Sequence, residues 1–375
     1  QNLLLVSRVA RGISPFIKTH SERTARSKPE PRFYASQKTA SPAESRSMTP
    51  ETMTDSWPLV SPPPPLLWAD LDNRGRRITS LPLSIGHRSP MKFVTYNIQY
   101  SLGQDGFHDL ERIAAALADA DVIGLQEVVR NVKGVPDRDQ PARLGQLLPT
   151  YYWVYGPTVD LDASAKSAGG TVTNARYQFG NMVLSRWPIL SSRLILLPRI
   201  LTTDTSNEQR GALEAIVDAP SGPIRVYSVH LDNHSPARRQ DELRFLLPRL
   251  FAVPQEGSSF SGPSWLGQPH SVTPDDFVVL GDFNLGPDSD EYREIVDLQD
   301  LGGTTQGHLV DTWTAAGPAL RHGVTWYADP ADPRSGIRVD YGFVSSGLAD
   351  RISAAWIDDE AVGSDHQPAW FHLSE

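Results

Sequence analysis

The stretch VVLGDFN at residues 278–284 constrains the fold of this chain more than any other. Three apolar residues and a glycine precede an aspartate and an asparagine two positions apart, which predicts a buried strand ending in polar side chains. Side chains alternate along an extended chain, so Asp282 and Asn284 point in one direction while Phe283 packs into the core. Open α/β sheets carry their chemistry at such carboxyl ends of strands.

Four further stretches show the same order, an apolar run followed by polar residues. They are VTYN at 94–97, VIGLQE at 122–127, VYSVHLD at 226–232 and RVDYGFVSS at 338–346. We predict that the polar ends of these strands meet in one site.

The pattern along the chain predicts an α/β protein in which strands outnumber helices. Apolar residues fall at helical spacing over 109–119 and 243–250, whereas most other apolar runs are short and bounded by turns. The order is neither a strict alternation of strand and helix nor all-β. We therefore predict a four-layer sandwich, in which two mixed β-sheets pack face to face and are flanked by helices.

Two segments are predicted to be loops. Residues 156–175 are polar and contain glycines, and residues 253–276 are rich in Pro, Gly and Ser. Loops of about 20 residues in a compact domain are usually functional or mobile. For 253–276, a lid over the substrate and an ordinary surface insertion remain open alternatives.

Composition divides the chain near residue 90. Residues 1–90 hold 13 Lys or Arg and 7 Asp or Glu, are rich in Ser, Pro and Thr, and lack a sustained apolar period. We expect a disordered or non-native extension there, and a folded domain over 91–375. The first 47 residues, with nine basic and three acidic side chains, also fit an organelle transit peptide.

The folded part is acidic. Subtracting the N-terminal residues from the totals of 35 basic and 44 acidic side chains leaves 22 and 37 for residues 91–375, a charge of about −15. Such a charge is a poor match for tracking duplex DNA. The chain has no cysteine, which excludes disulfides and thiolate metal sites. No apolar run approaches the ~18 residues that cross a bilayer, and we expect a cytoplasmic monomer.

The polar strand ends supply oxygen and imidazole ligands. They are Asn97, Glu127, His230, Asp282, Asn284, Asp340, Asp365 and His366. Carboxylates without thiolates favour a hard cation, Mg²⁺ or Mn²⁺, which would neutralise a phosphate group. Histidines and amides would contact the phosphate oxygens, as a metal-assisted phosphoester hydrolase requires. The alternatives are turn-capping roles for the two asparagines and a zinc hydrolase, for which imidazole ligands are few.

Seven motifs occur in a fixed order: YNIQ, LQE, GNMVLSRWPI, SVHLD, GDFN, RVDY and SDHQP. They resemble the endonuclease/exonuclease/phosphatase superfamily, which has the deoxyribonuclease-I-like fold, over residues 92 to about 373. Similar proteins include deoxyribonucleases, apurinic/apyrimidinic endonucleases, neutral sphingomyelinases and inositol polyphosphate 5-phosphatases. Gln99 and His230 depart from the acidic residue and the tyrosine of the apurinic/apyrimidinic endonucleases, which counts against that branch.

The resemblance implies a cation site on one side. Glu127 would be the principal Mg²⁺ ligand, with Asn97 beside it. Asp365 would assist the metal or the attacking water.

The resemblance also implies a phosphate-binding side. Asp282 would orient or deprotonate the attacking water, Asn284 would hold a phosphate oxygen, and His230 would contact the phosphate. Asp340 and His366 would form a hydrogen-bonded pair with the imidazole facing the scissile phosphate.

The implied activity is Mg²⁺-dependent hydrolysis of a phosphate ester by in-line attack of water, without a covalent enzyme intermediate. The substrate stays open between nucleic acid and a small or lipid phosphodiester, and the acidic domain favours a small or single-stranded one. The alternative from another class is a catalytically silent binding protein on the same fold.

Overall fold

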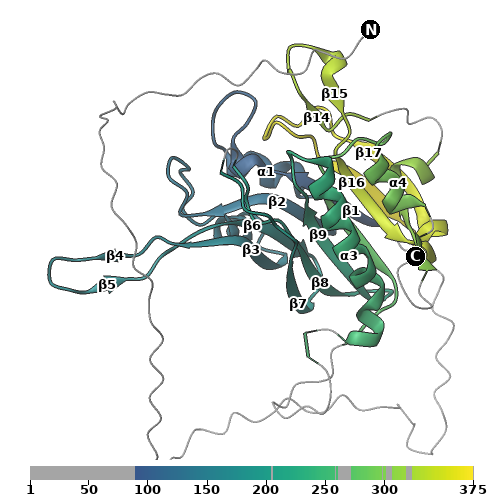
Figure 1. Cartoon of the computed structure of the whole chain (residues 1–375), viewed down its shortest axis with the longest axis horizontal. Helices are drawn as coiled ribbons and strands as arrows, with labels where there is room; N and C mark the ends of the chain where they lie inside the picture. Colours follow the sequence, from purple (N-terminus) through teal and green to yellow (C-terminus); the bar gives the residue numbers. More distant parts are fainter. Residues whose placement is uncertain are drawn as a thin grey trace, which may run out of the picture. The chain divides into compact units, whose positions relative to one another are not determined.

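Two six-stranded β-sheets form the body of the protein in a computed structural model (Figure 1). The structure describes residues 89–203, 206–257, 259–260, 272–297, 299–300, 306–317 and 323–374. The N-terminal extension predicted for residues 1–90 lies almost entirely outside these ranges and stays a prediction. The first strand begins at Met91, where the predicted domain begins.

The first sheet has the strand order β17-β18-β1-β2-β6-β3. Its strands span Ile352–Ile357 (β17), Ala369–Leu373 (β18), Met91–Asn97 (β1), Val122–Arg130 (β2), Arg176–Ser185 (β6) and Tyr152–Asp162 (β3). Strands β1 and β2 are parallel, and the other neighbours are antiparallel. The sheet is therefore mixed.

The second sheet has the order β13-β16-β10-β9-β8-β7. Its strands span Leu309–Asp311 (β13), Asp340–Ser345 (β16), Phe277–Asp282 (β10), Gly222–His230 (β9), Gly211–Ala219 (β8) and Ile189–Leu196 (β7). Here β9 and β10 are the parallel pair. In both sheets the parallel strands lie at the centre, so their carboxyl ends are flanked on both sides.

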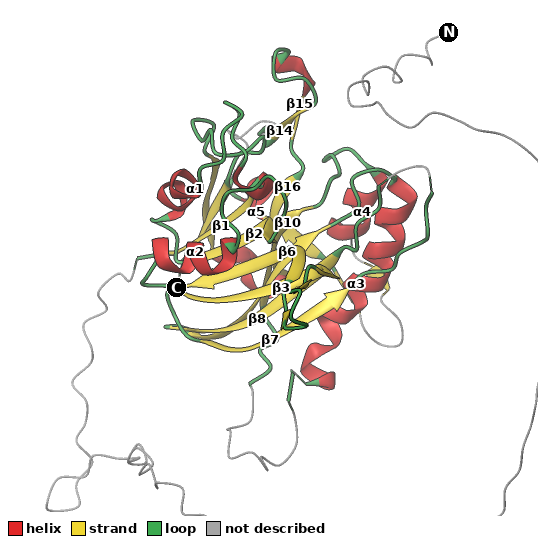
Figure 2. Ribbon diagram, turned by 90° about the vertical axis from the view of Figure 1, so that its left-hand side faces the viewer, coloured by secondary structure: helices red, strands yellow, loops and turns green. Residues whose placement is uncertain are grey.

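The sheets pack face to face, and helices cover their outer faces (Figure 2). Phe93 and Val122 of the first sheet share one core with Val226 and Leu280 of the second. The helices are α1 (Leu110–Leu117), α2 (Gln140–Leu147), α3 (Pro236–Glu256), α4 (Asp290–Val296) and α5 (Thr312–Ala315). α1 and α2 pack on the first sheet, and α3 and α4 on the second. The predicted four-layer sandwich is confirmed.

Local sequence explains the helix starts. Asp109 caps α1 by accepting a hydrogen bond from the Arg112 N–H at 2.9 Å, and Ser235 caps α3 ahead of Pro236. Aspartate and serine satisfy the free N–H groups of a first turn, and proline tolerates that position. None of the described helices combines the length and the apolar character that crossing a membrane requires.

The loop predicted at 156–175 is wrong over much of its length. Strand β3 continues to Asp162, paired with β6 as far as Arg176. The arm then carries a short pair, β4 (Ala165–Lys166) and β5 (Val172–Thr173), which projects from the body in Figure 1. An ion pair between Arg176 and Asp160, 2.8 Å long, connects β6 to β3. Cross-strand pairs of this kind stabilise a sheet, so these strands form although their residues do not alternate between apolar and polar.

The loop predicted at 253–276 begins later than expected. Helix α3 extends to Glu256 despite Pro248 and Pro254 in its interior. Residues 258 and 261–271 lie outside the described ranges, so the lid stays a prediction. Two further short strand pairs are β11 (Gln299–Asp300) with β12 (Gln306–Gly307) and β14 (Trp326–Tyr327) with β15 (Gly336–Ile337).

Candidate active site

The second sheet aligns three candidate residues by its register. His230 ends β9, Asp282 ends β10, and Asp340 begins β16. Asp282 pairs directly with His230 on one side and with Asp340 on the other. Paired residues on neighbouring strands point to the same face, so this register brings the three side chains side by side. The His230 Nε2 atom lies 3.4 Å from Asp282 Oδ2.

The first sheet contributes Asn97 and Glu127. Asn97 ends β1, and Glu127 lies in a bulge of β2, where pairing with β6 is interrupted between Leu125 and Val128. Glu127 has a φ of 58°, a left-handed backbone that is unusual for a residue other than glycine. Bulges redirect side chains beside active sites. This one leaves Glu127 partly exposed, next to the end of β1.

The Asn97 amide joins the two sheets. Its Nδ2 atom donates to Asp282 Oδ2 at 2.9 Å and to Glu127 Oε1 at 3.3 Å, and lies 3.5 Å from His366 Nε2. Glu127 and Asp282 are therefore connected through one amide group, although they belong to different sheets. The structure thus brings the strand ends together at one rim.

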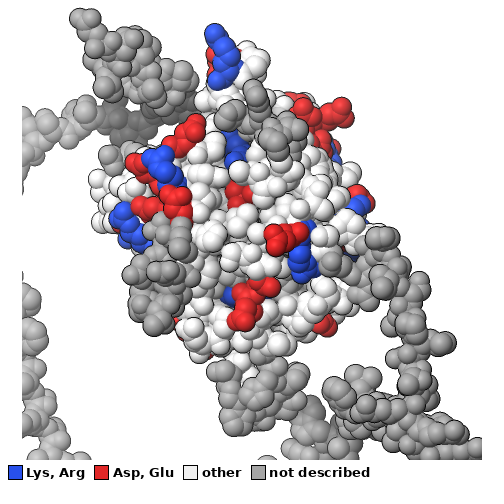
Figure 3. All heavy atoms as spheres, turned by 90° about the vertical axis from the view of Figure 1, so that its right-hand side faces the viewer, with Lys and Arg blue, Asp and Glu red and all other residues white. Residues whose placement is uncertain are grey.

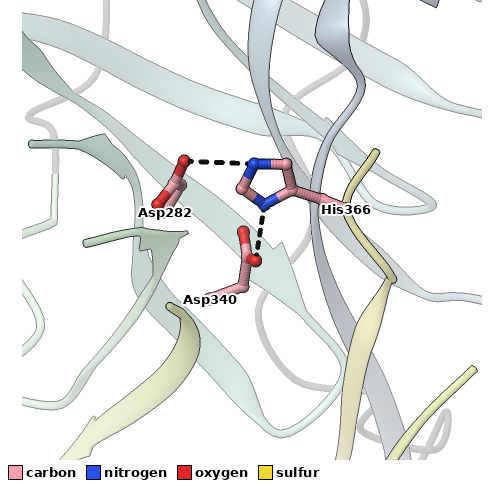
Figure 4. A group of neighbouring side chains, drawn as sticks. All are labelled: Asp282, Asp340 and His366. Atoms are coloured by element: carbon pink, nitrogen blue, oxygen red, sulfur yellow. Dashed lines mark hydrogen bonds and ion pairs between the residues drawn. The ribbon is translucent and has the colours of Figure 1, made fainter. Parts of the chain in front are cut away.

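His366 lies between the two aspartates of the second sheet (Figure 4). Its Nδ1 atom is 2.8 Å from Asp340 Oδ2, and its Nε2 atom is 3.8 Å from Asp282 Oδ2. Burial opposes protonation of the imidazole, but Asp340 and Asp282 outweigh it and raise the pKa of His366. Burial and the neighbouring Asp340 carboxylate raise the pKa of Asp282. A cationic imidazole and an aspartate of raised pKa therefore lie side by side.

His230 has the opposite character. Burial, followed by the charges of Arg210 and His366, lowers its pKa well below the usual value. The Arg210 Nη1 atom lies 3.0 and 2.9 Å from the two ring nitrogens, so His230 stays neutral. The two histidines of the site are thereby held in different protonation states.

Asn284 and Asp365 lie at the edge of this group. Asn284 has a φ of 52°, and its Nδ2 atom donates to the Leu231 carbonyl at 3.1 Å. Asp365 accepts hydrogen bonds at 3.3 Å from the Trp326 indole N–H and the Ser364 hydroxyl. Asn284 thus also serves local structure, and Asp365 is tied to the rim rather than to the aspartate cluster.

No sequence pattern predicts a role for Arg210. It is buried, and it also donates from Nη2 to Asn233 Oδ1 at 3.0 Å. The position of Arg210 follows from the pairing of the hairpin. Residues 211–219 and 222–230 flank a short turn, so Gly211 lies opposite His230, and Arg210 immediately precedes Gly211. A lone arginine before a strand has no motif spacing, so only the pairing reveals it.

The residues fit a divalent cation. The ligand atoms of Asp282, Asp340 and His366 all lie within 4.8 Å of one another and could hold a metal ion. The hydrogen bond between His366 Nδ1 and Asp340 Oδ2 already occupies one ring nitrogen and one carboxylate oxygen of this group. Glu127 accepts one long hydrogen bond, from Asn97 Nδ2 at 3.3 Å, and burial raises the pKa of its carboxyl. A cation beside Glu127 would offset that cost, and its oxygen donors suit a hard ion.

Two facing mixed sheets that bring carboxylates, amides and histidines to one rim supply the side chains that a phosphoester hydrolase uses. The model of the Endonuclease/Exonuclease/phosphatase family matches residues 94–260 and 264–366, well over half of the chain. The chain belongs to this family, which places it among phosphoester hydrolases, and the resemblance seen in the motifs is confirmed. No curated protein matches the sequence.

Solved structures share the fold at low sequence identity. An endonuclease/exonuclease/phosphatase from Beutenbergia cavernae is 24% identical, with a TM-score of 0.52, over 76% of this chain and 72% of that one. A humanized D. rerio TDP2 is 18% identical, with a TM-score of 0.50, over 77% of this chain and 100% of its own. A mannosyl-6-phosphatase from Bacteroides thetaiotaomicron is 17% identical, with a TM-score of 0.50, over 76% and 100%.

Proposed function

We propose that the chain is a Mg²⁺- or Mn²⁺-dependent hydrolase of phosphate esters in which water attacks phosphorus in line. The observation that carries the proposal is the Asn97 amide, which contacts both Glu127 and Asp282 and so joins the strand ends of two sheets. A catalytically silent protein would have no need to keep several buried ionisable groups together, because each costs free energy to bury.

Glu127 and Asn97 would hold the cation, with Asp365 assisting from the rim. The bound ion would neutralise phosphate charge and stabilise the leaving oxygen. The Asn97 side chain would then serve both sheets, because it already contacts Asp282. Glu127 is suited to this role, since the residue is partly exposed and a cation would offset the burial of its carboxyl.

Asp282 would take the proton of the attacking water. Its raised pKa makes the carboxylate a stronger base near neutral pH than an ordinary aspartate. Its Oδ1 atom accepts the Asn284 N–H at 2.9 Å, which fixes the carboxylate orientation. The proton acceptor is therefore held in place before substrate binds.

Two imidazoles and an amide would contact the phosphate oxygens. His366, kept protonated by Asp340, would donate a charged hydrogen bond to the oxygen on which negative charge develops. Neutral His230 would donate a second hydrogen bond, with Arg210 fixing its ring. Asn284 would hold a third oxygen from the turn after β10. These donors are fixed before the reaction, which reduces the reorganisation it needs.

The favoured substrate is a small phosphate ester or a single strand rather than duplex DNA. Residues 91–375 carry a charge of about −15, from 22 basic and 37 acidic side chains. The described part of the face in Figure 3 has acidic and basic groups interspersed among uncharged ones, rather than a continuous basic track. Duplex binding depends on neutralising many phosphates with Lys and Arg.

A substrate panel tests the proposal. It contains bis(p-nitrophenyl) phosphate, inositol phosphates, mannose 6-phosphate, sphingomyelin, a single-stranded oligonucleotide and plasmid DNA. We expect turnover of at least one small or single-stranded ester with Mg²⁺, and loss of that turnover on chelation with EDTA. Inactivity across the panel with either Mg²⁺ or Mn²⁺ would favour the silent binding protein.

A further inference from the structure

Gln140, the first residue of α2, has a buried amide side chain with an exposed fraction of 0%. Its Oε1 atom accepts from the Val129 N–H at 3.1 Å. Its Nε2 atom donates to the Tyr100 carbonyl at 2.8 Å and to the Ser101 hydroxyl at 3.2 Å. One amide group thus binds two segments of the chain, using both donors and its acceptor.

These two segments carry the candidate cation ligands. Val129 follows Glu127 by two residues in β2, and Tyr100 follows Asn97 by three residues beyond the end of β1. Gln140 therefore fixes the backbone just after each ligand. Gln140 thus links the backbone segments that follow the two candidate ligands.

Both segments need such support, because their backbone is strained. Gln99, Tyr100 and Ser101 have φ values of 42°, 44° and 70°, and Glu127 has 58°. Left-handed backbone at residues other than glycine persists only where the surroundings hold it. At the first segment, the Gln99 N–H also donates to Asn97 Oδ1 at 3.0 Å, so the turn and the ligand side chain are coupled.

We propose that Gln140 is a positioning residue for the divalent cation, acting through the backbones of Asn97 and Glu127 without touching the ion. The inference rests on the proposed function, since it concerns the same cation site. A purely structural Gln140 would affect only the stability of the fold. A positioning Gln140 sets the cation affinity of protein that is already folded.

The substitution Gln140→Met tests the inference, because it keeps the length of the side chain and removes its hydrogen bonds. We expect the Kd for Mn²⁺, measured by electron paramagnetic resonance on folded protein without substrate, to rise about 10- to 100-fold, the usual effect of losing a group that orients a metal ligand. The kcat at saturating Mg²⁺ should stay close to that of the wild type. The Val129 amide should exchange its hydrogen faster in cation-free protein.

A milder variant and a matched control complete the experiment. Ser101→Ala removes one of the Gln140 contacts and should raise the Kd by a smaller factor. Thr312→Val removes a buried hydrogen bond of 2.9 Å to the Gly342 carbonyl of β16, which belongs to the other sheet than Asn97 and Glu127. That control should lose stability and keep the wild-type affinity for Mn²⁺.

The outcomes separate this inference from the proposed function. Wild-type Mn²⁺ affinity in whichever of Gln140→Met and Ser101→Ala folds would overturn the positioning role while leaving the hydrolase intact. A wild-type protein that binds no Mn²⁺ and hydrolyses no ester would overturn the proposed function, and the inference with it.

Discussion

At the scale of single residues, the Asn97 side chain connects carboxylates from the two sheets, those of Glu127 and Asp282. Its amide lies between Glu127, Asp282 and His366. The polar character of each strand end could be predicted, because an apolar run that ends at Asp, Asn or His is a pattern in the sequence itself. The contact between Asn97 and Asp282 could not, since it depends on how the sheets face each other.

Asp282→Asn should lower kcat/KM by about 10²- to 10⁴-fold, because an amide cannot take the proton of the attacking water. The side chain keeps its size, so the fold should persist by circular dichroism. Hydrolysis of the best ester in the panel is the measurement, with the exposed Asp350→Asn as the control. Near wild-type turnover in Asp282→Asn would mean that the base lies elsewhere.

The pH profile of kcat/KM should have two limbs of opposite sign. Activity rises with pH as Asp282, whose pKa burial and Asp340 raise, loses its proton. It falls as His366, whose pKa Asp340 and Asp282 raise against the effect of burial, loses its own.

The substitution Asp340→Asn should move both limbs to lower pH, because Asp340 raises the pKa of His366 and also that of Asp282. An unchanged alkaline limb would remove His366 from the role of charged donor.

At the scale of elements, helix α3 shows why some boundaries escape sequence reasoning. Pro254 lacks an N–H, so the Leu250 carbonyl four residues earlier loses its usual partner. The buried Arg225 replaces it from β9, with Nη1 donating to that carbonyl at 2.7 Å. The helix therefore continues beyond Pro254, although a proline at this position predicts its end. The bulge at Glu127 also escapes prediction from sequence, because it is defined by how β2 pairs with β6.

Arg225→Met should destabilise the protein by about 2–4 kcal/mol, because each buried carbonyl left without a donor costs roughly 1–3 kcal/mol. Arg225 also donates to the carbonyls of Pro274 and Asp275, at 2.6 and 2.7 Å. Urea unfolding measures the effect. The control is Arg249→Met on the same helix, where the exposed arginine stacks on Phe245. Equal, small losses in both variants would show that Arg225 does not support the helix.

Glu242, buried on α3, should make stability depend on pH. Burial raises its pKa to about 7, above the value of an unfolded chain. Folding favours the protonated Glu242 carboxyl. Its contribution to the free energy of unfolding is therefore complete below about pH 4 and is lost as the pH rises through 7. Glu242→Gln should therefore be more stable than the wild type at pH 8, by up to about 3 kcal/mol, and gain little at pH 5.

Urea unfolding at both pH values measures this difference. The Asp232 N–H, which donates to Glu242 Oε2 at 2.8 Å, keeps an acceptor in the glutamine variant. A gain of the same size at pH 5 and pH 8 would mean that Glu242 does not titrate between them.

At the scale of the whole molecule, the layer order could be predicted because apolar runs, turns and few helices permit few architectures. The site needed more, since its residues extend from Asn97 to His366 and meet only when the two sheets pack. Arg210 and Gln140 carry no motif and emerge from strand register and burial. The residues that we propose to contact the substrate could therefore be predicted from the sequence, whereas the residues that support them could not.

The direct test of the central claim, that the strand ends of both sheets surround one hard cation, is a Mn²⁺-soaked crystal measured by anomalous diffraction. We predict one strong peak within about 2.0–2.6 Å of a Glu127 carboxylate oxygen, on the side that Asn97 shares with Asp282. A peak bound elsewhere, with Glu127 free of metal at saturating Mn²⁺, would contradict it.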